Sequence, residues 1–316
     1  MILTLTPNPS IDRTVSVPTF EHGEVNRASS SRIDPGGKGI NVARALTNND
    51  TPALALLPAG GPEGNLLQAL LRHSGTAFTA VPITGTTRMN IAVIEPDGTT
   101  TKVNEPGPTL TTAELDALLG AVDNTLGAGV RWVVGCGSLT PGMSDGIYAD
   151  LVRHGHAHGV KVAIDSSGAP FTAAVPAGPD LIKPNHEELE ELVGRRLHTL
   201  AEVADASRTI VDGGVATVIV SLGRHGALLV DAHVVTHASA HVAHPLSTVG
   251  AGDSLVAGYL HAVCRGAGPR EALAAGVAWG AAAVSLPGSR MPEPADIAAV
   301  AVTSTDTPDL ALVLSS

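Results

Sequence analysis

The residues best suited to chemistry lie where a glycine-rich turn runs into an expected helix. Residues 247–254 read Ser-Thr-Val-Gly-Ala-Gly-Asp-Ser, and apolar residues follow at helical spacing. The first N–H groups of a helix lack partners within it, and the helix dipole adds positive charge, so this turn predicts an anion site. Asp253 has two interpretations: it is a helix N-cap, or it is a general base beside an anion hole, the arrangement that phosphoryl transfer needs.

A second glycine-rich helix entry occupies residues 34–44, Asp-Pro-Gly-Gly-Lys-Gly-Ile-Asn-Val-Ala-Arg. Its glycines allow the backbone to approach a ligand closely. Lys38 supplies a point charge, and Asn41 supplies an amide on the first helical turn. The alternative is an ordinary helix entry that carries a solvated lysine.

Three further segments follow the ends of expected strands. In Lys-Pro-Asn-His-Glu-Glu-Leu (residues 183–189), Asn185 and Glu188 share one helix face, but the same spacing also fits a capping box. Residues 221–227 and 135–142 are glycine-rich, and each taken alone is an ordinary turn. Because ligands bind beyond the carboxyl ends of strands in open α/β sheets, these segments together indicate one binding edge.

Several function classes lack support in the sequence. The net charge of −11 argues against a broad nucleic-acid surface, so any phosphate site must use local cations and backbone N–H groups. Two cysteines are too few for a disulfide framework or a cysteine-rich metal site. P-loop, early GxGxxG, HExxH and GxSxG motifs are absent. Without a signal peptide or a bilayer-spanning segment, a cytoplasmic protein with no membrane partner is expected.

The positions of these segments depend on a regular alternation of strands and helices. Several of the expected strands are continuously apolar, which is typical of a sheet covered on both faces. The alternation predicts a mostly parallel central sheet with helices on both faces. The expected strands are 2–6, 53–57, 132–134, 160–164, 181–182 and 217–220, and the expected helices are 40–47, 65–72, 112–119, 145–156, 186–193, 253–265 and 269–285.

Two regions interrupt this alternation. Residues 12–33 contain short Val-, Thr- and Ser-rich stretches, and residues 88–104 read as a hairpin around Pro96-Asp97-Gly98. Antiparallel strands within an α/β chain predict a small β-sheet lid over the edge of the central sheet. No linker separates domains, so residues 1–316 are expected to form a single domain with this lid inserted.

Taken together, these segments resemble the PfkB/ribokinase family of sugar kinases. The resemblance spans nearly the whole chain, and its motifs stand in the family order. They are Thr6-Pro7-Asn8-Pro9-Ser10-Ile11-Asp12, Gly36-Gly37-Lys38-Gly39-Ile40-Asn41, Thr87-Arg88-Met89-Asn90, Gly137-Ser138-Leu139, Lys183 to Leu189, Ser221-Leu222-Gly223 and Gly250-Ala251-Gly252-Asp253. The Asn-Pro-x-x-Asp opening and Thr-Arg-x-Asn resemble the phosphosugar-kinase branch. Gly-Gly-Lys-Gly resembles the 1-phosphofructokinase and tagatose-6-phosphate kinase pattern.

The resemblance implies a ribokinase-like fold and a role for each matching residue. Asp253 would be the general base, and the backbone of Gly250, Ala251 and Gly252 would form the anion hole. Arg88 would grip the substrate's phosphate. The sugar side would further comprise Asp12, Gly37, Lys38, Asn41, Asn90 and Ser138, and the nucleotide side Lys183, Asn185, Glu188, Ser221, Gly223 and Gly226. Glu188 would hold Mg²⁺ through water, the lid would form a homodimer surface, and dependence on K⁺ is left open.

The resemblance implies ATP-dependent phosphorylation of D-fructose 1-phosphate at its 6-hydroxyl. Tagatose 6-phosphate and fructose 6-phosphate stay open as acceptors, and so does a non-catalytic protein that binds sugar phosphates. The sequence departs from the family pattern at Thr140 and Cys136, which puts the phosphate contact of Ser138 in doubt. Ser247 replaces a common Asp, but Asp253 is retained.

Overall fold

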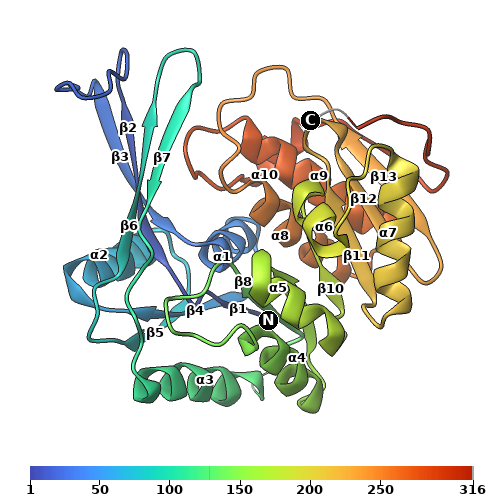
Figure 1. The fold of residues 1–316 in the computed structure, drawn as a ribbon, viewed down its shortest axis with the longest axis horizontal. Coiled ribbons are helices and arrows are strands. Elements are labelled where there is room, and N and C mark those ends of the chain that lie inside the picture. Colours follow the sequence, from blue (N-terminus) through green and yellow to red (C-terminus); the bar gives the residue numbers. More distant parts are fainter. Residues whose placement is uncertain (128, 315–316) are drawn as a thin grey trace.

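A ten-stranded sheet runs through the computed structural model, which describes residues 1–127 and 129–314 (Figure 1). Its order is β14 (Val302–Thr305), β13 (Val235–Ala240), β12 (Ala227–Asp231), β11 (Thr217–Ser221), β10 (Leu181–Ile182), β9 (Lys161–Asp165), β8 (Trp132–Cys136), β1 (Ile2–Leu5), β4 (Ala53–Ala59) and β5 (Phe78–Pro82). Neighbours from β11 to β5 run parallel, whereas β12, β13 and β14 pair antiparallel. The prediction of a mostly parallel sheet is confirmed. The antiparallel strands at one end of the sheet were not predicted.

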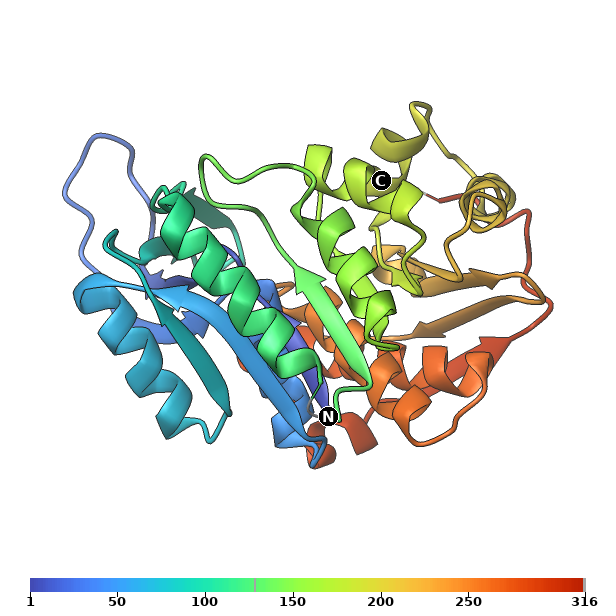
Figure 2. The ribbon, with the colours of Figure 1, turned by 90° about the horizontal axis from the view of Figure 1, so that it is seen from below.

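Helices cover both faces of the large sheet, as Figure 2 shows. One face carries α1 (Lys38–Asn48), α2 (Gly61–His73), α8 (Ala251–Cys264), α9 (Pro269–Val284) and the short α10 (Pro294–Ala298). The other carries α3 (Thr112–Leu126), α4 (Ile147–Ala157), α5 (Gly168–Ala174), α6 (His186–Val193) and α7 (Leu200–Asp212). Single 3₁₀ turns lie at Val175–Ala177 and Gly223–His225.

Successive strand residues enter opposite cores, which explains the continuously apolar strands. Trp132 and Val134 of β8 pack with the α1, α2, α8 and α9 side, while Val133 between them packs with the α3 to α7 side. Both sides of each central strand are therefore removed from water, as expected of a parallel sheet between two helical layers.

A second, four-stranded sheet stands apart from the large one and is called the small sheet below (Figure 1). Its order is β3 (Ser30–Gly36), β2 (Ser10–Ser16), β6 (Arg88–Ile94) and β7 (Thr100–Asn104). The β6–β7 hairpin was predicted from its turn residues. Strand β2 pairs parallel with β6, and Ser10 lies opposite Arg88. The strands extend two or three residues beyond the expected bounds of 12–33, because β2 begins at Ser10 and β3 ends at Gly36.

Helices α8 and α9 pack closely because glycines face large side chains between them. A Cβ added at Gly258 of α8 would lie 2.7 Å from Cγ of Trp279 and 2.8 Å from the carbonyl oxygen of Ala275. At Gly120 of α3, by contrast, an added Cβ would meet no atom within 4 Å. The two helical glycines therefore differ in the space beside them.

We expect the same substitution to change stability in opposite directions at these two glycines. Gly258→Ala should lower the free energy of unfolding by about 1–3 kcal/mol, because the added methyl overpacks the helix interface. Gly120→Ala should raise it by up to about 1 kcal/mol, because alanine favours the helix. Denaturant titration of both variants checks this, and equal effects would contradict the assigned packing.

Candidate active site

Asp253 lies in the first turn of α8 and is 6% exposed. Its Oδ2 accepts a hydrogen bond of 2.9 Å from Nδ2 of Asn41 in α1. Arg44, one helical turn further along α1, donates to Oδ1 of Asn41 and to the carbonyl oxygens of Pro35 and Ser289. The amide of Asn41 is therefore fixed with its donor facing Asp253, and the N-cap of α8 is Gly250 rather than Asp253.

The surroundings of Asp253 make it a stronger base than an exposed aspartate. Burial raises the pKa of Asp253 to about 6, and nearby Asp165 acts in the same direction. Lys38, Lys183 and the hydrogen bond from Asn41 oppose this shift. The carboxyl group is consequently ionised at neutral pH but holds a proton more readily than its ordinary value would allow.

The turn before α8 leaves the helix N-terminus open to a ligand. Gly250 has a left-handed φ of 78°, which favours glycine, and no side chain caps the helix. The Ala251 N–H makes only a 3.4 Å hydrogen bond to the carbonyl oxygen of Thr248. A Cβ added at Gly252 would lie 3.4 Å from Nζ of Lys183, so an ammonium group stands beside this turn. Backbone N–H groups and a cation together suit a phosphate.

Lys38 and Lys183 converge on one carboxylate that the sequence did not single out. Nζ of Lys38 lies 2.9 Å and Nζ of Lys183 lies 3.3 Å from Oδ1 of Asp165, the last residue of β9. Burial by itself would raise the pKa of Asp165, but Lys183 and Lys38 outweigh it and hold the pKa below its ordinary value. Burial also opposes the charged form of Lys38, yet Asp165 and Asp253 leave its pKa raised. The carboxyl end of an expected strand was the available signal for Asp165.

A network of polar side chains lies at the end of the small sheet where β2 and β6 begin, which is its base. Oδ1 of Asp12 accepts hydrogen bonds from Oγ of Ser10 at 2.7 Å and from Nδ2 of Asn90 at 2.9 Å. A Cβ at Gly36 would lie 2.3 Å from Oδ1 of Asp12, so only glycine leaves room for this carboxylate. Gly37 follows with φ of 118° and starts α1. The structure thus brings Asp12, Asn90 and Gly37 to one end of the small sheet.

Arg88 belongs to this network and donates hydrogen bonds to backbone carbonyl oxygens. Its Nη2 and Nε donate to the Asn8 carbonyl oxygen at 3.2 and 3.3 Å, and its Nη1 donates to the Glu105 carbonyl oxygen at 2.9 Å. Nη1 also lies 3.3 Å from Oδ1 of Asn90. Burial lowers the pKa of Arg88, whereas the negative charges of Asp12 and Glu105 act to raise it. Nδ2 of Asn8 lies 3.4 Å from Oγ of Ser138, which joins Ser138 to the same network.

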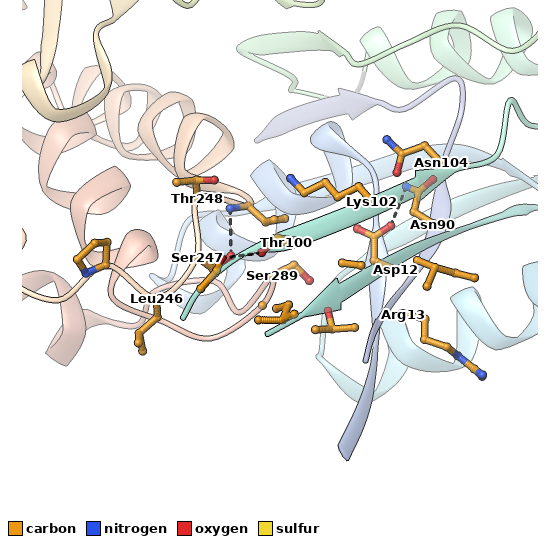
Figure 3. A pocket seen from close by; sticks show the side chains of 18 residues that line it. Asp12, Arg13, Asn90, Thr100, Lys102, Asn104, Leu246, Ser247, Thr248 and Ser289 are labelled. Carbon is orange, nitrogen blue, oxygen red and sulfur yellow. Dashed lines mark hydrogen bonds between the residues drawn. The ribbon is translucent and has the colours of Figure 1, made fainter. Parts of the chain in front are cut away.

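A cavity of about 390 Å³ separates the small sheet from the turn before α8 (Figure 3). Asp12 and Asn90, two of the residues predicted for the sugar side, line it, and so do Lys102 and Asn104 of β7, which were not among the predicted site residues. Pairing places Asn104 opposite Asn90 and Asn90 opposite Asp12, so these three form one row across the sheet. In Figure 3 the Lys102 side chain extends from β7 toward the segment containing Ser247 and Thr248.

A second cavity of about 720 Å³ lies on the other side of the turn before α8. The residues predicted for the nucleotide side that line it are Asn185, Ser221, Gly223 and Gly226. Ala251 and Gly252 line this cavity where it meets the anion turn. Leu255, Val277 and Val284 make another part of the cavity wall apolar. Pro245 and Thr248 line both cavities, so the two meet at the segment before α8, the helix whose first turn contains Asp253.

Asn185 and Glu188 form a complete capping box at the start of α6. Oδ1 of Asn185 accepts from the Glu188 N–H at 2.7 Å, and Oε2 of Glu188 accepts from the Asn185 N–H at 2.8 Å. The alternative interpretation of this segment, a helix capping box, is therefore confirmed. No cluster of three or more potential metal ligands occurs among residues 1–127 and 129–314.

Residues 6–296 match the sequence pattern of the pfkB family carbohydrate kinases. The chain belongs to this family. The family resemblance predicted from the seven motifs is confirmed, and with it the assignment as a sugar kinase. No helix in the described part of this pfkB-family kinase is long and apolar enough to cross a membrane.

Two similar relatives of this kinase carry different names. The 1-phosphofructokinase of Rhodobacter capsulatus is 36% identical over 305 residues, covering 96% of each chain. The ATP-dependent 6-phosphofructokinase isozyme 2 of Mycobacterium tuberculosis H37Rv is 38% identical over 299 residues, covering 91% of this kinase and 85% of the relative.

Solved structures agree with the ribokinase-like fold. Phosphofructokinase-2 from Escherichia coli, in complex with substrates and products, superimposes with a TM-score of 0.89 at 34% identity. That match covers 94% of this kinase and 97% of the other chain. Ribokinase from Thermotoga maritima, at 22% identity, covers 95% and 98% with a TM-score of 0.76, which shows the shared fold.

Proposed function

We propose that this kinase transfers the γ-phosphoryl group of ATP to the 6-hydroxyl of D-fructose 1-phosphate, giving fructose 1,6-bisphosphate and ADP. The observation that carries the proposal is the meeting of two cavities at the segment before α8, the helix whose first turn contains Asp253. The smaller cavity suits a polyol because Asp12, Asn90 and Asn104 line it, and the larger suits a nucleotide because part of its wall is apolar.

The transfer step follows from this arrangement. The 6-hydroxyl oxygen attacks the γ-phosphorus while its proton passes to a carboxylate oxygen of Asp253. The bond from the γ-phosphorus to its bridging oxygen breaks, and ADP leaves with that electron pair. The N–H groups of Gly250, Ala251 and Gly252 receive the charge on the transferring group. Asn41 keeps the base oriented by donating to its Oδ2.

The remaining predicted residues take supporting roles in this proposal. Arg88 and Ser138 bind the acceptor's own phosphate at the base of the small sheet, and Asp12 and Asn90 bind its hydroxyl groups. Lys183, Asn185, Ser221, Gly223 and Gly226 form the nucleotide side. Glu188 would hold Mg²⁺ through water, and the ion would supply charge neutralisation for the phosphates of the nucleotide.

Comparing four acceptors with MgATP tests the proposal: fructose 1-phosphate, fructose 6-phosphate, tagatose 6-phosphate and free fructose. The highest kcat/KM is expected for fructose 1-phosphate. Fructose 6-phosphate is the second candidate, because a relative named for 6-phosphofructokinase activity is 38% identical. A preference for either 6-phosphate would overturn the acceptor but keep the mechanism. Tight phosphosugar binding without ADP release would favour the non-catalytic alternative.

The rate should depend on pH through Asp253. Its pKa is raised to about 6, so the base is ionised above that pH and protonated below it. We expect kcat to be level between about pH 7 and 8 and to fall about tenfold per unit below pH 6. Steady-state rates across this range, with circular dichroism to show that the fold persists, check the prediction. A level profile down to about pH 5 would contradict it.

We also propose that the small sheet acts as a lid and as a homodimer surface within one domain spanning residues 1–316. The face opposite Asp12 carries Val15, Ile91, Val93 and Val103, and Val103 is 59% exposed. An exposed apolar sheet face suits contact with a second copy. Light scattering should give twice the chain mass, and Val103→Lys should shift the protein toward monomer.

A further inference from the structure

Three charged side chains from distant parts of the chain meet beside the anion turn. Lys38 begins α1, Lys183 follows β10, and Asp165 ends β9 between them in sequence. The whole sequence contains four lysines, and two of them contact the same carboxylate oxygen at 2.9 and 3.3 Å. Such convergence is costly to bury and needs an explanation.

The carboxylate that contacts both ammonium groups is that of Asp165, and the carboxylate of Asp253 also interacts electrostatically with both lysines. The side chains of Asp165 and Lys183 are 2% and 4% exposed, so water screens neither of them well. One aspartate faces two ammonium groups, and Oδ2 of Asp165 has no hydrogen-bond partner. Lys183 stands beside Gly252, and Lys38 is 36% exposed on the side open to solvent. Both ammonium groups therefore lie close to Asp253, and that of Lys183 also lies beside the anion turn.

Lys38 stands apart from the network that holds Arg88. Its ammonium contacts Asp165 and interacts electrostatically with Asp253. The contacts of Arg88 are instead the carbonyl oxygens of Asn8 and Glu105 and the amide of Asn90. The two cations that the family resemblance places on the sugar side are thus in separate networks.

We propose that Asp165 is a positioning residue that holds the ammonium groups of Lys38 and Lys183 against the transferring phosphoryl group. Lys38 then serves the γ-phosphate of the nucleotide and the transfer step, and the acceptor's own phosphate is left to Arg88 and Ser138. This inference rests on the proposed kinase function and corrects the sugar-side role implied for Lys38. Fixed cations lower the barrier because they need no reorganisation as charge moves onto the leaving group.

Nucleotide binding without any acceptor gives the first test. Lys38→Met should weaken binding of a non-hydrolysable ATP analogue about 10–100-fold in calorimetry, while ADP binding changes less than about threefold. Lys161→Met is the matched control, because Lys161 begins the strand that Asp165 ends and packs over Trp132. Equal losses for the analogue and ADP would overturn the assignment of Lys38 to the γ-phosphate. Since no acceptor is present, this result is independent of which sugar phosphate is the substrate.

Kinetics with the best acceptor give the second test. Lys38→Met and Asp165→Asn should each lower kcat about 10–100-fold and change the acceptor KM less than about threefold. The double variant should be no slower than the slower single variant, because both changes disable the same group. Multiplying effects would show that Asp165 acts independently of Lys38. A raised acceptor KM at unchanged kcat in Lys38→Met would return Lys38 to the sugar phosphate. Melting temperatures show whether Asp165→Asn still folds. If it does not, the kinetics of Lys38→Met alone test the proposal.

Discussion

Asp253→Asn should lower kcat about 10²–10⁴-fold, because the amide cannot take the proton of the attacking hydroxyl. The substitution keeps the shape of the side chain and an oxygen that can face Nδ2 of Asn41. Binding of ATP and of the sugar phosphate should therefore change less than about threefold. Initial rates at saturating substrates, with calorimetry for binding, measure both effects.

Asp116→Asn provides the matched control for this prediction. Asp116 is exposed on α3, in the opposite helical layer, so the same chemical change there should leave kcat unaltered. A kcat within tenfold of the original in Asp253→Asn would remove Asp253 from the role of base. An equal loss in both variants would point to a defect in the preparations.

Arg88→Ala should raise the KM for the sugar phosphate about 10²-fold, with the KM for ATP changed less than about threefold. Charge-assisted hydrogen bonds to a phosphate are each worth about 1.5–3 kcal/mol, and one or two are lost. Arg88→Lys should recover only part of the affinity, because lysine lacks the planar fork of donors. Steady-state kinetics with each substrate varied in turn measure these effects.

Rates with free fructose distinguish two reasons for a loss of activity in Arg88→Ala: a lost contact with the phosphate of the substrate, and a disturbed small sheet. Arg88 also braces Asn8 and Glu105, so its loss could disturb the sheet without any ligand. If the guanidinium binds phosphate, the small kcat/KM for unphosphorylated fructose should be the same in Arg88→Ala and in the original protein. A parallel loss with free fructose would show that Arg88 supports the fold instead. A raised KM for ATP alone would reverse the two subsites.

The central strands were predictable because their apolar runs and positions report burial on both faces. The antiparallel end was not predicted, because the Gly-rich segment at 221–227 was interpreted as a turn, and β12 begins within it at Ala227. Helix α7 was also missed, although Thr199 and Glu202 form a capping box before Leu200 and Val203 at helical spacing. That signal was local and available in the sequence.

The site was predictable where a motif carries its own geometry, as at Gly250 to Asp253. It was not predictable where charges meet through tertiary structure. The contact of Lys38 with Asp165 joins positions 127 residues apart, and nothing local in either segment indicates it. Likewise, Asn104 joins Asn90 and Asp12 only through the register of β7 with β6 and of β6 with β2.

All four connections between the small sheet and the rest of the chain lie at one end, the end of Ser10, Gly36 and Arg88. The segments 17–29 and 95–99 lie at the other end, so a rotation of the small sheet as a unit would have its axis near Arg88. Strand β2 is about 20 Å long at a rise of about 3.3 Å per residue, so a rotation of about 10° sweeps its tip through about 3.5 Å. Such a rotation would reshape the cavity wall at Thr100 and Lys102 while leaving the guanidinium of Arg88 nearly stationary.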